Sequence, residues 1–364
     1  MTIIEAVREQ HRAPVVSLLI DTDVHPMYSV NDLLSRLDEP WRSRVARFGE
    51  PSGPTQSAHV NFPRLRNGGV RLDSRVGSTP PGSDLSVVGH QLLDEFDENF
   101  AVLIPLMRGE GEPAFQAALC RAVNEWIREE WLDRDPRLRS TLNVPFDAPE
   151  LAVREIEHFA GDRRFVQVMV PGSAHSEWGD QRYWPIYEAA AAASLPVMIH
   201  VGGRNNGYRG AGYPSYYTEE HLWLHTTVAR LVMSLICSGV FEHVPTLQVA
   251  LIEACVSWAG PLQWAMDQTF EQLGDDLPRL KQLPSQYFRE HFWFSTQPIE
   301  EPDDPDDLLH ALQFTGMTDR IMFSSDYPHW DFDSPSRALP ISIKGKLREQ
   351  IMGRNACRLY GLEA

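Results

Sequence analysis

Short apolar runs alternate with longer amphipathic segments along most of the chain. The apolar runs are rich in β-branched and aromatic residues, which favours buried strands. The expected strands are Val15–Asp21, Phe100–Leu106, Leu138–Phe146, Phe165–Gly172, Pro196–Gly202, Leu247–Ala254, Phe292–Pro298 and Arg320–Pro328. The segments between them carry apolar residues at helical spacing. The expected helices are Glu112–Trp131, Ala148–Ala160, Tyr183–Ala193, Glu219–Ser238 and Val256–Leu273.

This alternation predicts an α/β fold. Nearly continuous apolar strands separated by amphipathic helices are typical of a parallel sheet that is covered on both faces. Eight such units in 364 residues favour a closed (β/α)8 TIM-like barrel over an open sheet. No GxGxxG turn or P-loop follows any expected strand, which argues against a nucleotide-binding sheet. We therefore predict one barrel domain that spans residues 1–364.

Two segments depart from the repeat. Residues from about 27 to 89 are rich in Gly, Pro and Ser, and we predict an irregular insertion after the first strand. The second segment, Gly203–Glu220, is a long loop after the fifth strand with several aromatic residues. Loops that follow barrel strands lie at the carboxyl-terminal face, where barrel active sites are found. We expect this loop to cover a binding site, with surface decoration as the alternative.

Composition and charge exclude several classes of protein. The formal net charge of −17 repels phosphate backbones, so we expect no nucleic-acid partner. No apolar run is long enough to span a membrane, and Met1–Pro14 lacks the pattern of a secretory signal. The four cysteines are widely spaced, without a CxxC pair, and we expect them to be reduced. These features predict a soluble, cytoplasmic protein.

Polar side chains gather at the ends of four expected strands. Asp23 and His25 end the first, His200 ends the fifth, Glu253 ends the sixth, and Asp326 ends the eighth. In a closed barrel these ends converge, and buried carboxylates and imidazoles need a divalent cation between them. Mixed nitrogen and oxygen ligands suit Zn²⁺, Mn²⁺ or Fe²⁺ better than Mg²⁺ or Ca²⁺. Asp21, deeper in the first strand, is expected to form hydrogen bonds within the barrel instead.

The motifs "IDTDVHP", "MIHVGG", "VALIEAC" and "FSSDYPHWD" occur in the order seen in one known family. With "SGVFEHVPTLQVALIE" and "GRNACRLYGL", they make the chain similar to the amidohydrolase superfamily, in its amidohydrolase-2 (aminocarboxymuconate-semialdehyde-decarboxylase-like) branch. The resemblance runs from about Val15 to Leu362. It implies one divalent metal ion, zinc by first preference, held by Asp23, His25, His200 and Asp326. It also implies a homodimer.

Two positions differ from the pattern of that branch and bear on the reaction. Asp23 stands where the first His of an HxH motif is usual, and DxH favours the decarboxylases. Glu253 stands where a His is usual, and a third carboxylate disfavours an anionic ligand. We expect a hydrolase, in which a metal-activated water attacks an amide, lactone or related bond. The alternative is a non-oxidative decarboxylase of a small carboxylate-bearing substrate.

The other candidate residues concern catalysis and substrate binding. Asp326 and Glu253 are the candidate proton-transfer groups, and His329 is either a catalytic group or a structural part of the "YPHW" turn. Arg204 and Arg209 could bind a substrate carboxylate, or could be solvated loop residues. Tyr217 belongs to the aromatic residues that suggest an aromatic or cyclic substrate.

Overall fold

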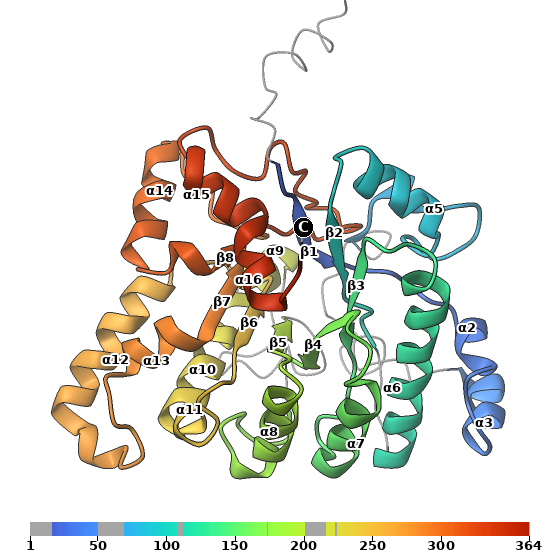
Figure 1. Cartoon of the computed structure of the whole chain (residues 1–364), viewed down its shortest axis with the longest axis horizontal. Helices are drawn as coiled ribbons and strands as arrows, with labels where there is room; N and C mark the ends of the chain where they lie inside the picture. Colours follow the sequence, from blue (N-terminus) through green and yellow to red (C-terminus); the bar gives the residue numbers. More distant parts are fainter. Residues whose placement is uncertain are drawn as a thin grey trace, which may run out of the picture.

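A single parallel sheet organises the fold (Figure 1). The structure is a computed structural model that describes residues 17–49, 69–107, 112–172, 174–200, 216–222 and 224–363. The strands are hydrogen-bonded in sequence order. They are β1 (Ile20–Val24), β2 (Phe100–Leu103), β3 (Leu138–Leu142), β4 (Phe165–Val170), β5 (Val197–His200), β6 (Val249–Ile252), β7 (Phe292–Ser295) and β8 (Ile321–Met322).

The sheet closes on itself beyond the end of β8. The backbone N–H of Thr22 donates to the carbonyl of Phe323 at 3.1 Å, and that of Asp326 donates to the carbonyl of Asp23 at 3.0 Å. The N–H of His25 donates to the carbonyl of Tyr327 at 2.7 Å. Since β1 is thereby tied to the segment after β8, the predicted (β/α)8 barrel is confirmed.

Helices surround the strands, and several begin at the signals that the sequence provides (Figure 1). Helices α6, α7, α13 and α14 each begin with a proline, which lacks the N–H that the first turn leaves unbonded. The outer helices are α6 (Pro113–Ile127), α7 (Pro149–Phe159), α8 (Trp184–Ala192), α9 (Tyr217–Leu222), α10 (Leu224–Cys237), α11 (Val240–His243), α12 (Ala259–Leu273), α13 (Pro284–His291), α14 (Pro305–Phe314) and α15 (Gly345–Glu349). Among the described residues, we find no helix with the length and apolar character needed to cross a bilayer.

The barrel interior is apolar at the amino-terminal end of the strands. Ile20 of β1, Met198 of β5 and Trp293 of β7 belong to one buried cluster. Helix α16 (Asn355–Tyr360) adds Leu359 and Tyr360 to it. This filling leaves the opposite, carboxyl-terminal end of the barrel for polar side chains.

The first strand lies further along the chain than predicted. We expected Val15–Asp21, but β1 is Ile20–Val24, so Asp21 and Asp23 lie inside the strand. The pairing of β1 with β2 shifts register between Asp21 and Val24. Apolar composition marks buried residues, but it cannot locate a strand whose polar side chains are buried as well.

The insertion after β1 is more regular than predicted. It contains α2 (Val30–Leu34), α3 (Trp41–Phe48) and α5 (Leu85–Val88), and α2 packs beside α6 (Figure 1). Leu33 of α2 and Val45 of α3 are fully buried, because each short helix turns one apolar residue inward. The Gly, Pro and Ser content of the whole segment concealed these helices. Residues 201–215, most of the predicted loop after β5, lie outside the described residues.

Candidate metal centre

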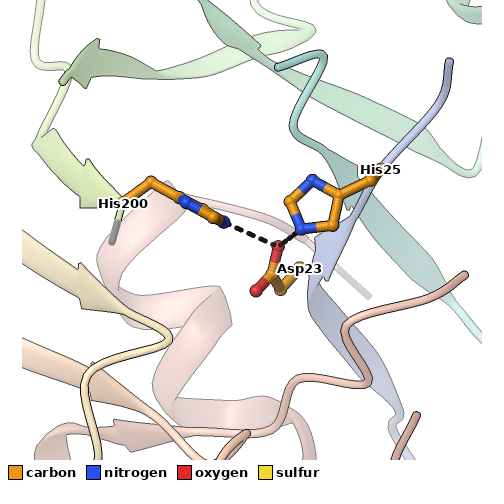
Figure 2. Close-up of side chains that lie close together, drawn as sticks. All are labelled: Asp23, His25 and His200. Atoms are coloured by element: carbon orange, nitrogen blue, oxygen red, sulfur yellow. Dashed lines mark ion pairs between the residues drawn. The ribbon is translucent and has the colours of Figure 1, made fainter. Parts of the chain in front are cut away.

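Asp23 and His25 lie together at the carboxyl-terminal end of β1. Nε2 of His25 is 3.0 Å from Oδ1 of Asp23, and the two side chains are 1% and 0% exposed. Figure 2 shows the imidazole of His25 turned toward the Asp23 carboxylate. The pairing of β1 with β2 shifts register between Asp21 and Val24, at this end of the strand, and Asp23 and His25, two residues apart, face the same side.

His200, the last residue of β5, faces the same carboxylate from across the barrel (Figure 2). Its Nε2 lies 3.9 Å from Oδ1 of Asp23. The rings of His25 and His200 are nearly perpendicular, with centroids 5.0 Å apart. Two imidazoles from different strands therefore converge on Asp23.

Asp326 approaches from the loop after β8 and completes the group. Its Oδ1 lies 2.9 Å from Nε2 of His25 and 2.6 Å from Nδ1 of His329. Asp326 has a φ of 58°, a left-handed conformation that costs an L residue roughly 1–3 kcal/mol and is often found at functional sites. This backbone conformation belongs to the turn that brings Asp326 and His329 to His25.

The hydrogen bonds of His25 leave Nε2 as the atom available to a metal ion. Its Nδ1 lies 3.0 Å from the carbonyl oxygen of Ile104, and a carbonyl can only accept, so Nδ1 carries the proton. Nε2 then presents a lone pair, the arrangement that metal-binding histidines use. Its contacts with the two carboxylates lack hydrogen-bond geometry.

Several carboxylate oxygens of this group are buried without a hydrogen-bond partner among the described residues. Both carboxylate oxygens of Asp23 and Oδ2 of Asp326 have no hydrogen-bond partner among the residues that the structure describes. Leaving a buried charge unpaired is costly. The possible ligand atoms of Asp23, His25 and His200 lie within 4.8 Å of one another, as do those of His25, Asp326 and His329. The set of oxygen and nitrogen donors therefore fits one divalent cation.

The carboxylates and imidazoles shift one another's protonation. Burial alone lowers the pKa of His25, but the charges of Asp23 and Asp326 outweigh it and raise that pKa well above its usual value. Burial favours a high pKa for Asp326, but His329 and His25 bring it below the usual range. Together these shifts describe a cation held between two carboxylates, the place that a metal ion would take.

Glu253 stands at the edge of the group, directly after β6. Its Oε2 is 3.5 Å from Nε2 of His200, and its backbone N–H donates to Oγ of Ser295 at 3.0 Å. The side chain is 13% exposed, whereas Asp23 and Asp326 are 0% and 1% exposed, so Glu253 alone of the three has access to solvent. Burial, followed by the charges of Asp326 and Asp23, raises the pKa of Glu253 well above its usual value.

The end of the insertion supports both loops that carry these residues. Val70 pairs with His329, and the N–H of Met27 donates to the carbonyl of Gly82. Gly82 has a φ of 66°, and a Cβ there would lie 3.1 Å from the carbonyl oxygen of His25 and 3.0 Å from Cγ of Pro328. Glycine is needed at this position because the insertion packs directly against the loops after β1 and β8.

The structure brings together most of the residues that the sequence singled out. Asp23, His25, His200, Asp326, Glu253 and His329 form the group described above. Asp21 stands apart, as expected, with its Oδ1 accepting from the N–H groups of Asp23 and Ser325. Arg204 and Arg209 lie outside the described residues, so their roles stay predictions.

Tyr217 and a pair that the sequence did not reveal lie beside this group. Nε1 of Trp330 donates to the hydroxyl of Tyr217 at 3.2 Å. Burial is the main cause of the raised pKa of Tyr217, and Asp331, Glu253 and Asp326 add to it. Nε2 of His221 is 3.6 Å from Oδ2 of Asp331. The acidic "DFD" after "YPHW" was the available signal for Asp331, but only the fold brings α9 to it.

Comparisons with known proteins show what this chain is similar to. The amidohydrolase family model (Amidohydro_2) matches residues 20–362. A gamma-resorcylate decarboxylase from Polaromonas sp. strain JS666 is 24% identical over 261 residues, which is 66% of this chain and 76% of that protein.

Solved structures share the fold. The 5-carboxyvanillate decarboxylase of Sphingomonas paucimobilis superposes with a TM-score of 0.65 at 21% identity, covering 95% of this chain and 99% of that one. A dihydroxybenzoic acid decarboxylase from Polaromonas sp. JS666, solved with bound manganese and the inhibitor 2-nitroresorcinol, has a TM-score of 0.62 at 20% identity, covering 95% and 97%. At these identities the likeness shows the fold. Since the family model spans nearly the whole chain, the protein belongs to the amidohydrolase-2 family.

Proposed function

We propose that the protein is a metal-dependent, non-oxidative decarboxylase of a small, ring-hydroxylated aromatic acid. The observation that carries the proposal is the buried Asp23 carboxylate, which faces two imidazoles and has no hydrogen-bond partner among the described residues. Such a carboxylate calls for a cation, and the Asp at this position is the feature that favoured decarboxylation in the sequence.

Hydrolysis, our first expectation, has less support than its alternative. The relative that is 24% identical over 66% of this chain is a gamma-resorcylate decarboxylase. A second one, from Rhizobium, is 24% identical over 78% of this chain. Glu253 was expected to disfavour decarboxylation, because a third carboxylate would repel an anionic substrate. This argument weakens, since a carboxyl with a raised pKa can hold its proton and then does not repel the substrate.

We assign the metal ligands to Asp23, His25, His200 and Asp326. Their two negative charges match one divalent ion, which would draw the substrate's carboxylate and neighbouring hydroxyl into the site and hold them there. The sequence favoured Zn²⁺ and left Mn²⁺ or Fe²⁺ open. The manganese in the Polaromonas decarboxylase, and the mixed carboxylate and imidazole ligands here, support Mn²⁺ as the first ion to test.

The chain itself must supply a proton to the ring. Decarboxylation places one proton on the ring carbon that bears the carboxylate. The bond to that carboxylate then breaks, its electron pair returns to the ring, and CO₂ leaves. We assign the proton to Glu253, because it contacts His200 and also reaches solvent, from which it can regain a proton. His329 holds Asp326 in place through its 2.6 Å contact, and Tyr217, Arg204 and Arg209 are the proposed substrate-binding residues.

Replacement of Glu253 by Gln is expected to slow turnover without loss of the metal. An amide cannot donate a proton as an acid, so kcat should fall by about 10²–10⁴-fold, the usual size of a general-acid contribution. Metal content should equal that of the wild type, because Glu253 lies outside the assigned ligands. Steady-state kinetics and metal analysis on the same preparation check both points, and an unchanged kcat would remove Glu253 from the reaction.

The reaction class is tested by following two atoms during turnover. The protein is supplied with Mn²⁺ and carboxyl-¹³C-labelled hydroxybenzoates, 2,6-dihydroxybenzoate first, in H₂¹⁸O. We expect release of ¹³CO₂ and a product that has gained one hydrogen at the former carboxylate carbon. Amide and lactone substrates are supplied in parallel, and a hydrolase would place solvent ¹⁸O in their products. That outcome without ¹³CO₂ from the hydroxybenzoates would reject decarboxylation.

A further inference from the structure

A series of hydrogen-bonded, buried polar groups connects the outer helices with His25. Asn124 of α6, Asn143 after β3 and Glu155 of α7 are 0%, 2% and 5% exposed, and none belongs to the group at the barrel mouth. Buried amides and carboxylates are costly unless their hydrogen bonds are made. The partners of these three residues show what they hold in place.

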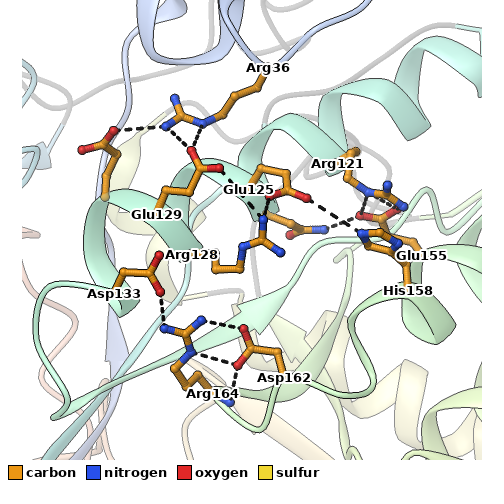
Figure 3. A network of polar contacts seen from close by, with 12 residues as sticks. Arg36, Arg121, Glu125, Arg128, Glu129, Asp133, Glu155, His158, Asp162 and Arg164 are labelled. Carbon is orange, nitrogen blue, oxygen red and sulfur yellow. Dashed lines mark hydrogen bonds and ion pairs between the residues drawn. The ribbon is translucent and has the colours of Figure 1, made fainter.

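The outer end of this series is an ion pair between α6 and α7. Arg121 approaches Glu155 with two nitrogens: Nε lies 3.1 Å from Oε1 and Nη2 lies 2.8 Å from Oε2 of the carboxylate. Figure 3 shows this pair at one side of a wider network of charged residues, which extends from α6 and α7 to Arg36 and Arg164. The bidentate contact fixes the orientation of a carboxylate that is almost entirely buried.

The middle of this series is the side-chain amide of Asn124, which forms hydrogen bonds through both its nitrogen and its oxygen. Its Nδ2 donates to Oε1 of Glu155 at 2.9 Å and to the backbone carbonyl of Asn143 at 2.9 Å. Its Oδ1 accepts from the backbone N–H of Asn143 at 3.0 Å. With both hydrogens of Nδ2 and the oxygen engaged, the amide binds the backbone of Asn143 from two directions.

The inner end of this series reaches the residues beside His25. Nδ2 of Asn143 donates to the carbonyl of Pro105 at 3.1 Å. The preceding carbonyl, that of Ile104, accepts from Nδ1 of His25 at 3.0 Å, and the N–H of Ile104 donates to the carbonyl of Val24. Two consecutive carbonyls are thus held, one by Asn143 and the other by His25.

We propose that Asn143 is a positioning residue for His25, which acts through the carbonyls of Pro105 and Ile104. By holding the Pro105 carbonyl, Asn143 fixes the peptide that aims the Ile104 carbonyl at Nδ1, and this contact sets the proton and the ring orientation of His25. Groups that orient a metal-binding histidine typically contribute about 10–100-fold to metal affinity. The inference rests on the proposed function, because it takes His25 as a ligand.

The test compares two buried asparagines that each donate to a backbone carbonyl. Asn355 is as buried as Asn143, and its Nδ2 donates to the carbonyl of Ile321 at 2.7 Å, at the amino-terminal end of β8, whereas the metal ligands lie at the carboxyl-terminal ends of the strands. Mn²⁺ affinity is measured on the metal-free full chain of the wild type, Asn143→Ala and Asn355→Ala by competition with a chelating indicator. The melting temperatures of the metal-free proteins are recorded in parallel.

The expected result is selective loss of metal affinity. Asn143→Ala should raise the Kd for Mn²⁺ about tenfold, whereas Asn355→Ala should lower the melting temperature and leave the Kd within about twofold of the wild type. Asn143→Ser, whose hydroxyl is too short to reach Pro105, should also weaken binding and carries the test if the alanine variant does not fold. An unchanged Kd for the Asn143 variants, or an equal loss in Asn355→Ala, would overturn the inference. Absence of Mn²⁺ binding by the wild type would instead reject the metal site itself.

Discussion

Asp326→Asn is expected to reduce CO₂ release by at least about 10²–10³-fold, the effect of removing one group that stabilises the reacting charges. The amide has no negative charge to hold a divalent cation between Asp23 and His25. The amide would also present an N–H donor or an uncharged oxygen to His25 and His329. In the wild type, Oδ1 of Asp326 lies 2.9 Å from Nε2 of His25 and 2.6 Å from Nδ1 of His329. Rates with saturating Mn²⁺ and metal content after desalting measure the loss of both properties.

The same change at Asp267 is the matched control for Asp326. Oδ1 of Asp267 in α12 accepts from the N–H of Ser285 at 2.8 Å, among the outer helices. Asp267→Asn should keep the metal and the wild-type rate. Wild-type activity in Asp326→Asn would refute the assignment of Asp326 as a ligand.

Removal of the metal is expected to abolish activity and to lower stability. Without a cation, Asp23, Asp326 and Glu253 place three carboxyl groups in one buried region. Rebinding stabilises the folded state by mass action, by about 2.7 kcal/mol when free Mn²⁺ is 100 times its Kd. Thermal unfolding with and without Mn²⁺ measures this gain. Asp23→Ala, which lacks one proposed ligand, should show little gain, and an equal gain in this variant would place the ion elsewhere.

The order of strands and helices in the barrel could be predicted from the hydrophobic pattern alone, because each buried strand is a short apolar run between amphipathic helices. The predicted helix Ala148–Ala160 lies within one residue of α7 at each end, whereas the predicted helix Glu219–Ser238 is divided into α9 and α10. The pattern fails at β1, where Asp21 and Asp23 are buried in the strand, and at α2 and α3, whose buried faces are too small to produce a clear periodicity. Where burial and polarity coincide, composition cannot locate an element.

The candidate site could be predicted because its residues lie at strand ends, which a barrel brings together. Asp23, His25, His200 and Asp326 needed only the order of the strands. Asn143 and Glu155 could not be found in this way, since their role depends on which carbonyl an amide reaches across two elements. The single domain, the cytoplasmic location and the homodimer stay predictions.

The most direct test of the account is a titration of the metal-depleted protein with Mn²⁺ while ¹³CO₂ is collected from carboxyl-labelled hydroxybenzoates. We predict no release without metal, and a rate that rises with added Mn²⁺ and reaches its plateau at one equivalent per chain. Release that is independent of metal would contradict the proposed centre. Failure to release ¹³CO₂ from any labelled aromatic acid at full metal content would contradict the proposed reaction.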